Sequence, residues 1–173
     1  MNQPCKKLVA TSFFILALLA APDVFGQFVV VVPTASKIDS LSLKDLKTIF
    51  KGYSVKGTGG APYQIVEFRP IGDAFYKKLY GLDSYSIGKH WLRMIFSGER
   101  VLPPKSFSDI NRFIKFLQSH DNSIGFLTVK LFESLASKSL RAVVIDGCSY
   151  KHIQYALRAT RQDSISPNSQ RKD

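Results

Sequence analysis

The sequence predicts an α/β protein with a mixed, mostly parallel sheet that is flanked by helices. Three observations support this fold class. Predicted strands alternate with amphipathic helices along the chain. The first strand, Phe28–Val32, is a continuous apolar, β-branched run ended by Pro33, as is typical of strands buried on both faces in parallel sheets covered by helices. Hydrophobic residues make up 45% and charged residues 21% of the 173 residues, which indicates a globular rather than a disordered chain.

Capping residues and apolar spacing predict the next two elements. After a polar loop at Thr34–Ser40, Ser42 has the side chain of an N-cap, and Asp45 follows three residues later as the acid of a capping box. Gly52 ends this helix, and Tyr63–Phe68 is the second strand. The apolar face predicted for the helix consists of Leu43, Leu46, Ile49 and Phe50.

Three more helices are predicted in the middle of the chain. One begins at Asp73 and has Gly81 as its C-cap. The second runs from about Ser86 to Phe96 and is stopped by Gly98, and the third is capped by Ser108. The broad apolar stripe expected for the second of these helices consists of Ile87, Trp91, Leu92 and Ile95.

The last part of the chain is predicted to contain two strands and two helices. Ser123–Leu127 is a short strand, Lys130–Ser137 a short helix, Leu140–Ile145 a further strand and Tyr150–Arg158 a final helix. Residues 159–173 are polar and rich in Ser, Gln, Asn and Pro, which predicts a disordered basic tail.

Residues 1–26 are predicted to be a signal peptide. Lys6 and Lys7 form a positive region before the apolar stretch Leu8–Ala21, which is short for a membrane span, and cleavage is expected before Gln27. Cleavage after Ala21 and a retained anchor are the alternatives. Residues 27–158 would then form one folded domain that is exported from the cytoplasm.

The charge of the chain favours an anionic partner. With 24 Lys and Arg against 13 Asp and Glu, the formal charge is +11, which suits nucleic acid, lipid, a cell surface or a small anion. The basic residues are spread along the chain without a dense block, so no nucleic-acid partner is expected. The sequence contains no CxxC or HExxH metal motif, no GxSxG elbow and no P-loop. We therefore predict no metal, no cofactor and no enzymatic activity.

The best candidate for an anion site is the junction between Phe68 and the helix after it. Arg69 could bind an oxyanion through two N–H groups, and Gly72 would let the anion approach the backbone at the start of a helix. Asp73 is interpreted first as the N-cap of that helix and second as a ligand that accepts a hydrogen bond from a protonated oxyanion. Thr34 and Ser36, which follow the first strand, are the next candidate donors, against simple solvation of their loop.

Four segments, taken in order, resemble the phosphate ABC-transporter substrate-binding protein family. They are SLSLKDLKTIFKG (Ser40–Gly52), VEFRPIGDAFYKKLYGL (Val66–Leu82), HWLRMIFSGERVLPP (His90–Pro104) and NSIGFL (Asn122–Leu127). The similarity covers about Val29–Ile145. Each segment is weak by itself, whereas four in the right order and spacing are fairly specific.

The resemblance implies a periplasmic-binding-protein-like fold of the second type, in which two α/β lobes close on an oxyanion. This chain matches mainly one lobe, so residues 27–158 would be a short, single-lobe form. The family usually places Arg and then Gly-Ser-Gly-Thr at the anion site, where this chain has Arg69 and then Gly72, Asp73, Ala74 and Phe75. Two hydroxyls are therefore missing, and a carboxylate stands in the place of one of them.

What the resemblance implies for function is an exported solute-binding module of the periplasm, with secretion as the alternative. Its ligand would be phosphate or a related oxyanion, and its partner an ABC transporter membrane component or another envelope protein. One lobe supplies only one of the two surfaces that would enclose the ligand. The chain would therefore bind weakly, form a homodimer or have lost phosphate binding. The alternative function is a ligand-less interaction or signalling protein that keeps the fold.

Overall fold

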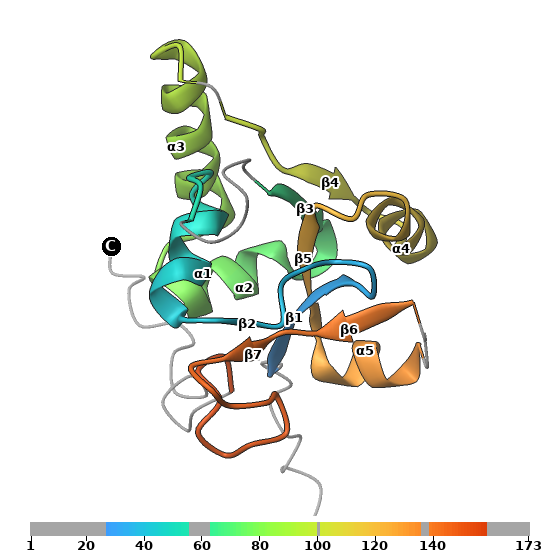
Figure 1. Cartoon of the computed structure of the whole chain (residues 1–173). Helices are drawn as coiled ribbons and strands as arrows, with labels where there is room; N and C mark the ends of the chain where they lie inside the picture. The colour runs from blue at the N-terminus through green and yellow to red at the C-terminus, as the bar shows by residue number, and fades with distance from the viewer. Residues whose placement is uncertain (1–26, 56–62, 100, 136–138, 159–173) are drawn as a thin grey trace, which may run out of the picture.

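A computed structural model describes residues 27–55, 63–99, 101–135 and 139–158 (Figure 1). They form a five-stranded sheet in the order β4-β3-β5-β1-β6 and a separate two-stranded sheet of β2 and β7. The strands are β1 (Phe28–Pro33), β2 (Ser40–Leu41), β3 (Gln64–Phe68), β4 (Lys105–Phe107), β5 (Ser123–Thr128), β6 (Leu140–Ala142) and β7 (Val144–Ile145).

The main sheet is mixed and mostly parallel, as predicted. β3 pairs in parallel with both β4 and β5, whereas β1 pairs antiparallel with both β5 and β6. Four strands therefore point in one direction and β1 alone points in the other. The expectation that Phe28–Val32 would pair as a parallel strand is wrong. Its continuous apolar run indicates that the strand is buried on both faces. Helices on both sides of a sheet bury a strand in this way whether it is parallel or antiparallel to its neighbours.

Helices cover both faces of the sheet, so the described residues form three layers (Figure 1). One face carries α1 (Leu43–Phe50), α2 (Arg69–Tyr80) and α3 (Ser84–Phe96), and the other carries α4 (Ile110–Gln118) and α5 (Val129–Ser134). Alternate residues of β1 serve the two cores, because successive side chains of a strand point to opposite faces. Phe28, Val30 and Val32 join the α1–α3 side, and Val29 and Val31 join the α4–α5 side.

An aromatic cluster fixes α1 and α2 on the sheet. The rings of Phe75 and Phe126 are stacked with centroids 3.7 Å apart, and Phe50 packs beside Phe75 at 5.2 Å. All three side chains are fully buried. Because each such ring removes a large apolar area from water, this cluster holds the middle of α2 against α1 and β5.

Several predicted caps are confirmed. The Ser42 hydroxyl accepts a hydrogen bond from the Asp45 N–H at 3.0 Å, and Gly52, Gly81 and Gly98 have positive φ after α1, α2 and α3. Two other caps shift by a residue or more. Asp83 caps α3, which therefore begins at Ser84, and Asp109 rather than Ser108 caps α4.

Three further expectations are wrong. Leu140–Ile145 is not one strand, because Val143 leaves β6 to donate to the Val30 carbonyl and β7 then pairs with β2. Tyr150–Arg158 forms successive turns instead of a helix, since its N–H groups bond three residues back and the Leu157 carbonyl accepts from Phe28. Pro103 and Pro104 predict a loop over Glu99–Lys105, but Lys105 begins strand β4. The predicted signal peptide (1–26) and basic tail (159–173) lie outside the described residues.

The predicted apolar stripe of α3 is only half right. Trp91 and Ile87 are buried, but Leu92 and Ile95 are about half exposed, at 54% and 46%. α3 has apolar residues on most of its circumference but lies at the edge of its layer (Figure 1). A helix in that position buries only the side that faces the core. Among the described residues, no helix is long and apolar enough to cross a bilayer.

A candidate anion site where strand β3 meets helix α2

The structure places Arg69 at the first position of α2, directly after β3. The N-cap, Phe68, has no side-chain hydrogen bond to offer, and Pro70 follows in the first turn. The first-turn N–H groups of this 12-residue helix therefore receive no capping side chain. Arg69 is exposed and forms no ion pair with any carboxylate of the described residues. An uncapped helix start beside a free guanidinium is an arrangement that attracts anions.

Gly72 is held close to another group, the carboxylate of Glu67. A Cβ at Gly72 would collide with Glu67 Oε1, so the carboxylate fills the space that the absent side chain leaves. Ser106, on the neighbouring strand β4, donates its hydroxyl to Glu67 Oε2 at 3.3 Å. Burial raises the pKa of Glu67, while the Ser106 hydrogen bond and the charge of Arg69 oppose that rise. The protein's own carboxylate thus lies where the sequence predicts that an oxyanion would approach.

Asp73 has a structural role that differs from the predicted one. It lies inside α2, four residues after the helix begins, so its interpretation as the N-cap is wrong. Its carboxylate accepts the Ser84 N–H at 3.0 Å and pairs with Lys77 at 2.8 Å. The Lys77 hydrogen bond, and then the Ser84 hydrogen bond, lower the pKa of Asp73. Asp73 therefore ties α2 to the start of α3, and the ionised carboxylate is the form that does so.

Thr34 and Ser36 do not lie beside Arg69. Val66, Gly125 and Val31 are aligned across β3, β5 and β1, and β1 runs opposite to β3. Arg69 is three residues beyond that line in one direction and Thr34 three residues in the other, which separates them by about 20 Å along the strands. The rule that carboxyl ends of strands meet at one edge holds for parallel strands, and β1 is the strand that breaks it.

Both hydroxyls at that far edge bond to nearby backbone. Thr34 donates to the Ser139 carbonyl at 3.5 Å. Ser36 is 7% exposed, and its hydroxyl accepts from the Ile38 N–H at 3.3 Å. These contacts organise the turn after β1.

A buried hydroxyl that sequence reasoning missed lies near Glu67. The Tyr76 O–H is buried and has no hydrogen-bond partner in the described part of the chain. Burial first, and the Glu67 charge second, raise the pKa of Tyr76 well above its usual range. The tyrosine one helical turn after Gly72 is the only sequence cue for this donor. The junction therefore gathers a guanidinium, a carboxyl and two hydroxyls.

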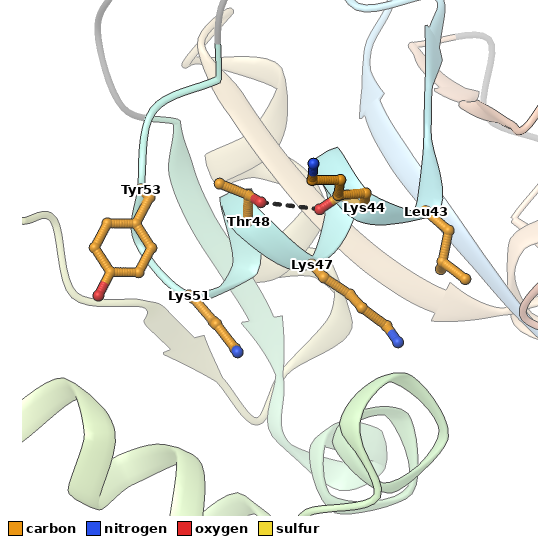
Figure 2. A pocket seen from close by; sticks show the side chains of 6 residues that line it. All are labelled: Leu43, Lys44, Lys47, Thr48, Lys51 and Tyr53. Carbon is orange, nitrogen blue, oxygen red and sulfur yellow. Dashed lines mark hydrogen bonds between the residues drawn. The ribbon is translucent and has the colours of Figure 1, made fainter.

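A second basic feature was not predicted at all. Lys44 and Lys47 of α1 and its C-cap Lys51, together with Leu43, Thr48 and Tyr53, line a pocket of about 500 Å³ (Figure 2). Their spacing of three and four residues is visible in the sequence and could have indicated a shared helix face. No group of three His, Cys, Asp or Glu side chains in the described residues is arranged to hold a metal ion.

Comparison with known proteins adds information at the level of the fold. No family model and no curated protein matches the chain. Three similar solved structures are an ABC-type phosphate transport receptor from Vibrio cholerae (14% identity, TM-score 0.49), a possible phosphate-binding protein from Planctomyces limnophilus (16%, 0.50) and a proposed phosphate ABC transporter substrate-binding protein from Clostridium perfringens with bound phosphate (16%, 0.49).

The likeness covers 72%, 69% and 72% of this chain but 48%, 41% and 47% of those proteins, so the chain spans about half of their length. At such identities the likeness establishes the fold alone. The chain shares its fold with part of the Planctomyces limnophilus protein, and its mixed, mostly parallel sheet flanked by helices agrees with the fold class that the sequence predicts.

Proposed function

We propose that the chain is a non-catalytic solute-binding module that binds phosphate or a similar small oxyanion at the β3–α2 junction. The proposal places it in the periplasm, next to an ABC transporter membrane component or another envelope protein. The observation that carries it is Arg69, an exposed guanidinium on the uncapped first turn of α2 that has no ion-pair partner among the described residues. The fold shared with phosphate-binding proteins supports the same ligand class.

Glu67 makes the proposed binding dependent on pH. Ionised Glu67 repels an oxyanion beside Gly72, whereas protonated Glu67 can donate a hydrogen bond to it. Since burial raises the pKa of Glu67, the protonated form is reached at a higher pH than for an exposed glutamate. Affinity for phosphate or sulfate is therefore expected to rise as the pH falls through the Glu67 pKa.

Isothermal titration of the chain with phosphate and with sulfate, at pH values below and above the Glu67 pKa, tests the proposal. Arg69→Gln should weaken binding by about tenfold or more, since hydrogen bonds to charged groups contribute about 1.5–3 kcal/mol. Glu67→Gln should strengthen binding at neutral pH and remove the pH dependence of sulfate binding, since sulfate does not itself titrate in this range. Arg112→Gln, which removes an exposed arginine from α4 on the other face of the sheet, is the matched control. Absence of heat for wild type and Glu67→Gln at millimolar anion would rule out the ligand.

A second candidate function, a protein-interaction module, is favoured by the outer side of α3. Tyr85 and Phe96 are 70% and 86% exposed and continue the exposed stripe of Leu92 and Ile95. Lys89 lies along the stripe, with its ammonium 4.4 Å from the Tyr85 ring centroid, and α3 contains no acidic residue. Large exposed apolar residues with a basic border suit a partner whose apolar groove has an acidic border.

Site-specific photo-crosslinking tests the second candidate. A crosslinker at position 96 should form one adduct with an identifiable protein that carries such an acidic border, and Leu92→Ser should abolish it without altering the free energy of unfolding. A crosslinker at exposed Ser134 of α5 is the control. Equal adducts at both positions would contradict this function.

A further inference from the structure

Three lysines on α1 and at its C-cap line one pocket, and in the described part of the chain no carboxylate pairs with them. Lys44, Lys47 and Lys51 form no ion pair with any carboxylate of the described residues. The only acid of α1, Asp45, accepts the hydroxyl of Ser42 at 2.7 Å and so serves the helix start. With a rise of 1.5 Å per residue, the three ammonium-bearing positions span about 10 Å of the helix. Like charges at this spacing repel one another, and an anion between them relieves that repulsion.

The backbone under these lysines is held by groups from α2 and α3. Tyr80 of α2 donates its hydroxyl to the Lys47 carbonyl at 2.6 Å, and the His90 ring of α3 lies 3.1 Å from the Lys51 carbonyl. The Lys51 ammonium lies 5.4 Å from the centroid of the Tyr80 ring. The backbone that carries Lys47 and Lys51 is thus held by two other helices, so a ligand has to order only the lysine side chains.

The spacing of the lysines determines which class of anion fits. One orthophosphate can contact one or two ammonium groups, whereas a chain about 10 Å long can contact all three positions. Figure 2 shows Lys47 and Lys51 extending on the same side of the helix. Lysine ammonium groups act as point charges on flexible stems, which suits repeated phosphate groups better than a single planar carboxylate. We propose that this pocket binds a linear oligophosphate.

This pocket is separate from the β3–α2 junction. Arg69 begins α2 and Tyr80 ends it, so the two sites lie at opposite ends of a 12-residue helix, about 17 Å apart at 1.5 Å per residue. Neither site therefore requires the other. A helix C-terminus also favours nearby cations, and Lys47 and Lys51 would lie there with or without a ligand. The experiment has to separate these two roles.

Titration of the full chain with tripolyphosphate, followed by calorimetry and by thermal unfolding, makes that separation. We expect one-to-one binding and a higher unfolding temperature with tripolyphosphate than with orthophosphate at equal ionic strength. The double variant Lys47→Gln/Lys51→Gln should weaken tripolyphosphate binding by about tenfold or more, since binding to phosphates loses affinity with each lysine removed. Lys44→Gln, which lies away from the helix C-terminus, should weaken it as well.

The matched control is Lys115→Gln/Lys130→Gln, which removes the same charge from exposed lysines of α4 and α5 on the other face of the sheet. It should leave tripolyphosphate binding unchanged. An equal loss in the Lys115/Lys130 control would overturn the proposal, because it would indicate nonspecific charge attraction. So would wild type that binds no tripolyphosphate, or that binds a single-stranded oligonucleotide of the same charge equally well.

Discussion

Replacing Gly72 with alanine tests whether the Glu67 carboxylate really occupies the space at the start of α2. The new methyl would collide with Oε1 of Glu67 and lie 3.2 Å from its Cδ. The side chain can swing away because only its far end is in contact, and it then loses the hydrogen bond from Ser106.

The energies on the two sides of this substitution nearly cancel. Alanine in a helix interior gains about 1 kcal/mol over glycine. Losing the Ser106 hydrogen bond costs about 1 kcal/mol. The free energy of unfolding of Gly72→Ala at neutral pH should therefore stay within about 1 kcal/mol of wild type.

Gly72→Ala should change the pH dependence of the free energy of unfolding much more than its value at neutral pH. In wild type the raised pKa of Glu67 means that the folded state holds this proton more tightly than the unfolded state. That contribution is fully present below the unfolded pKa and is lost as the pH rises through the folded pKa. In Gly72→Ala the expelled carboxylate is solvated, so the free energy of unfolding no longer falls with pH because of Glu67. The variant therefore becomes more stable relative to wild type as the pH rises from acid to neutral.

Urea unfolding at a series of pH values between about 4 and 7 measures both quantities. Glu67→Gln is the reference, because it removes the titrating group without adding a methyl. The reasoning is refuted if Gly72→Ala loses more than about 2 kcal/mol, the figure expected when a core group cannot move aside. It is also refuted if the variant keeps the wild-type pH slope.

Three other substitutions have expected outcomes in urea unfolding. Phe126→Ala removes a fully buried, stacked ring and should cost about 3–5 kcal/mol. Gly52→Ala places a methyl at φ 91° against the Trp91 indole, whereas Gly98→Ala places one at φ 73° in open space. Gly52→Ala should therefore lower the free energy of unfolding by about 1–3 kcal/mol more than Gly98→Ala. Equal losses in the two variants would contradict the packing argument. Asp73→Ala should cause a small loss that is present at neutral pH and vanishes as the pH falls through the lowered Asp73 pKa, whereas a loss independent of pH would contradict the ion pair.

Local features that involve neighbouring residues could be predicted from the sequence. Ser42 with Asp45 and the glycines that end α1, α2 and α3 depend on a single turn of backbone, so residue type decides them. The alternation of strands and helices, and hence the fold class, follows from apolar periodicity in the same way. The predicted cap was wrong where two possible capping residues are adjacent in the sequence, as at Ser108 and Asp109, of which Asp109 caps α4.

The candidate site depended on contacts between distant segments, and there prediction failed in part. Arg69 was placed correctly between a strand and a helix because the two elements are adjacent in the chain, but the helix was predicted to begin at Asp73 and begins at Arg69. Thr34 and Ser36 were grouped with it on the assumption that β1 is parallel to β3, which an apolar run cannot reveal. The Ser106 hydroxyl reaches Glu67 from 39 residues away.

Sequence alone was enough for the class of fold, for the order of most helices and strands, and for placing Arg69 between a strand and a helix, although not for the residue at which α2 begins. These features rest on periodicity and on capping, which act over a few residues. Three features became visible only in the folded chain: β1 is reversed, Glu67 fills the space beside Gly72, and Lys44, Lys47 and Lys51 border one pocket. Strand direction and side-chain proximity are set by the packing of whole layers against one another, and that packing has no signature within any single segment.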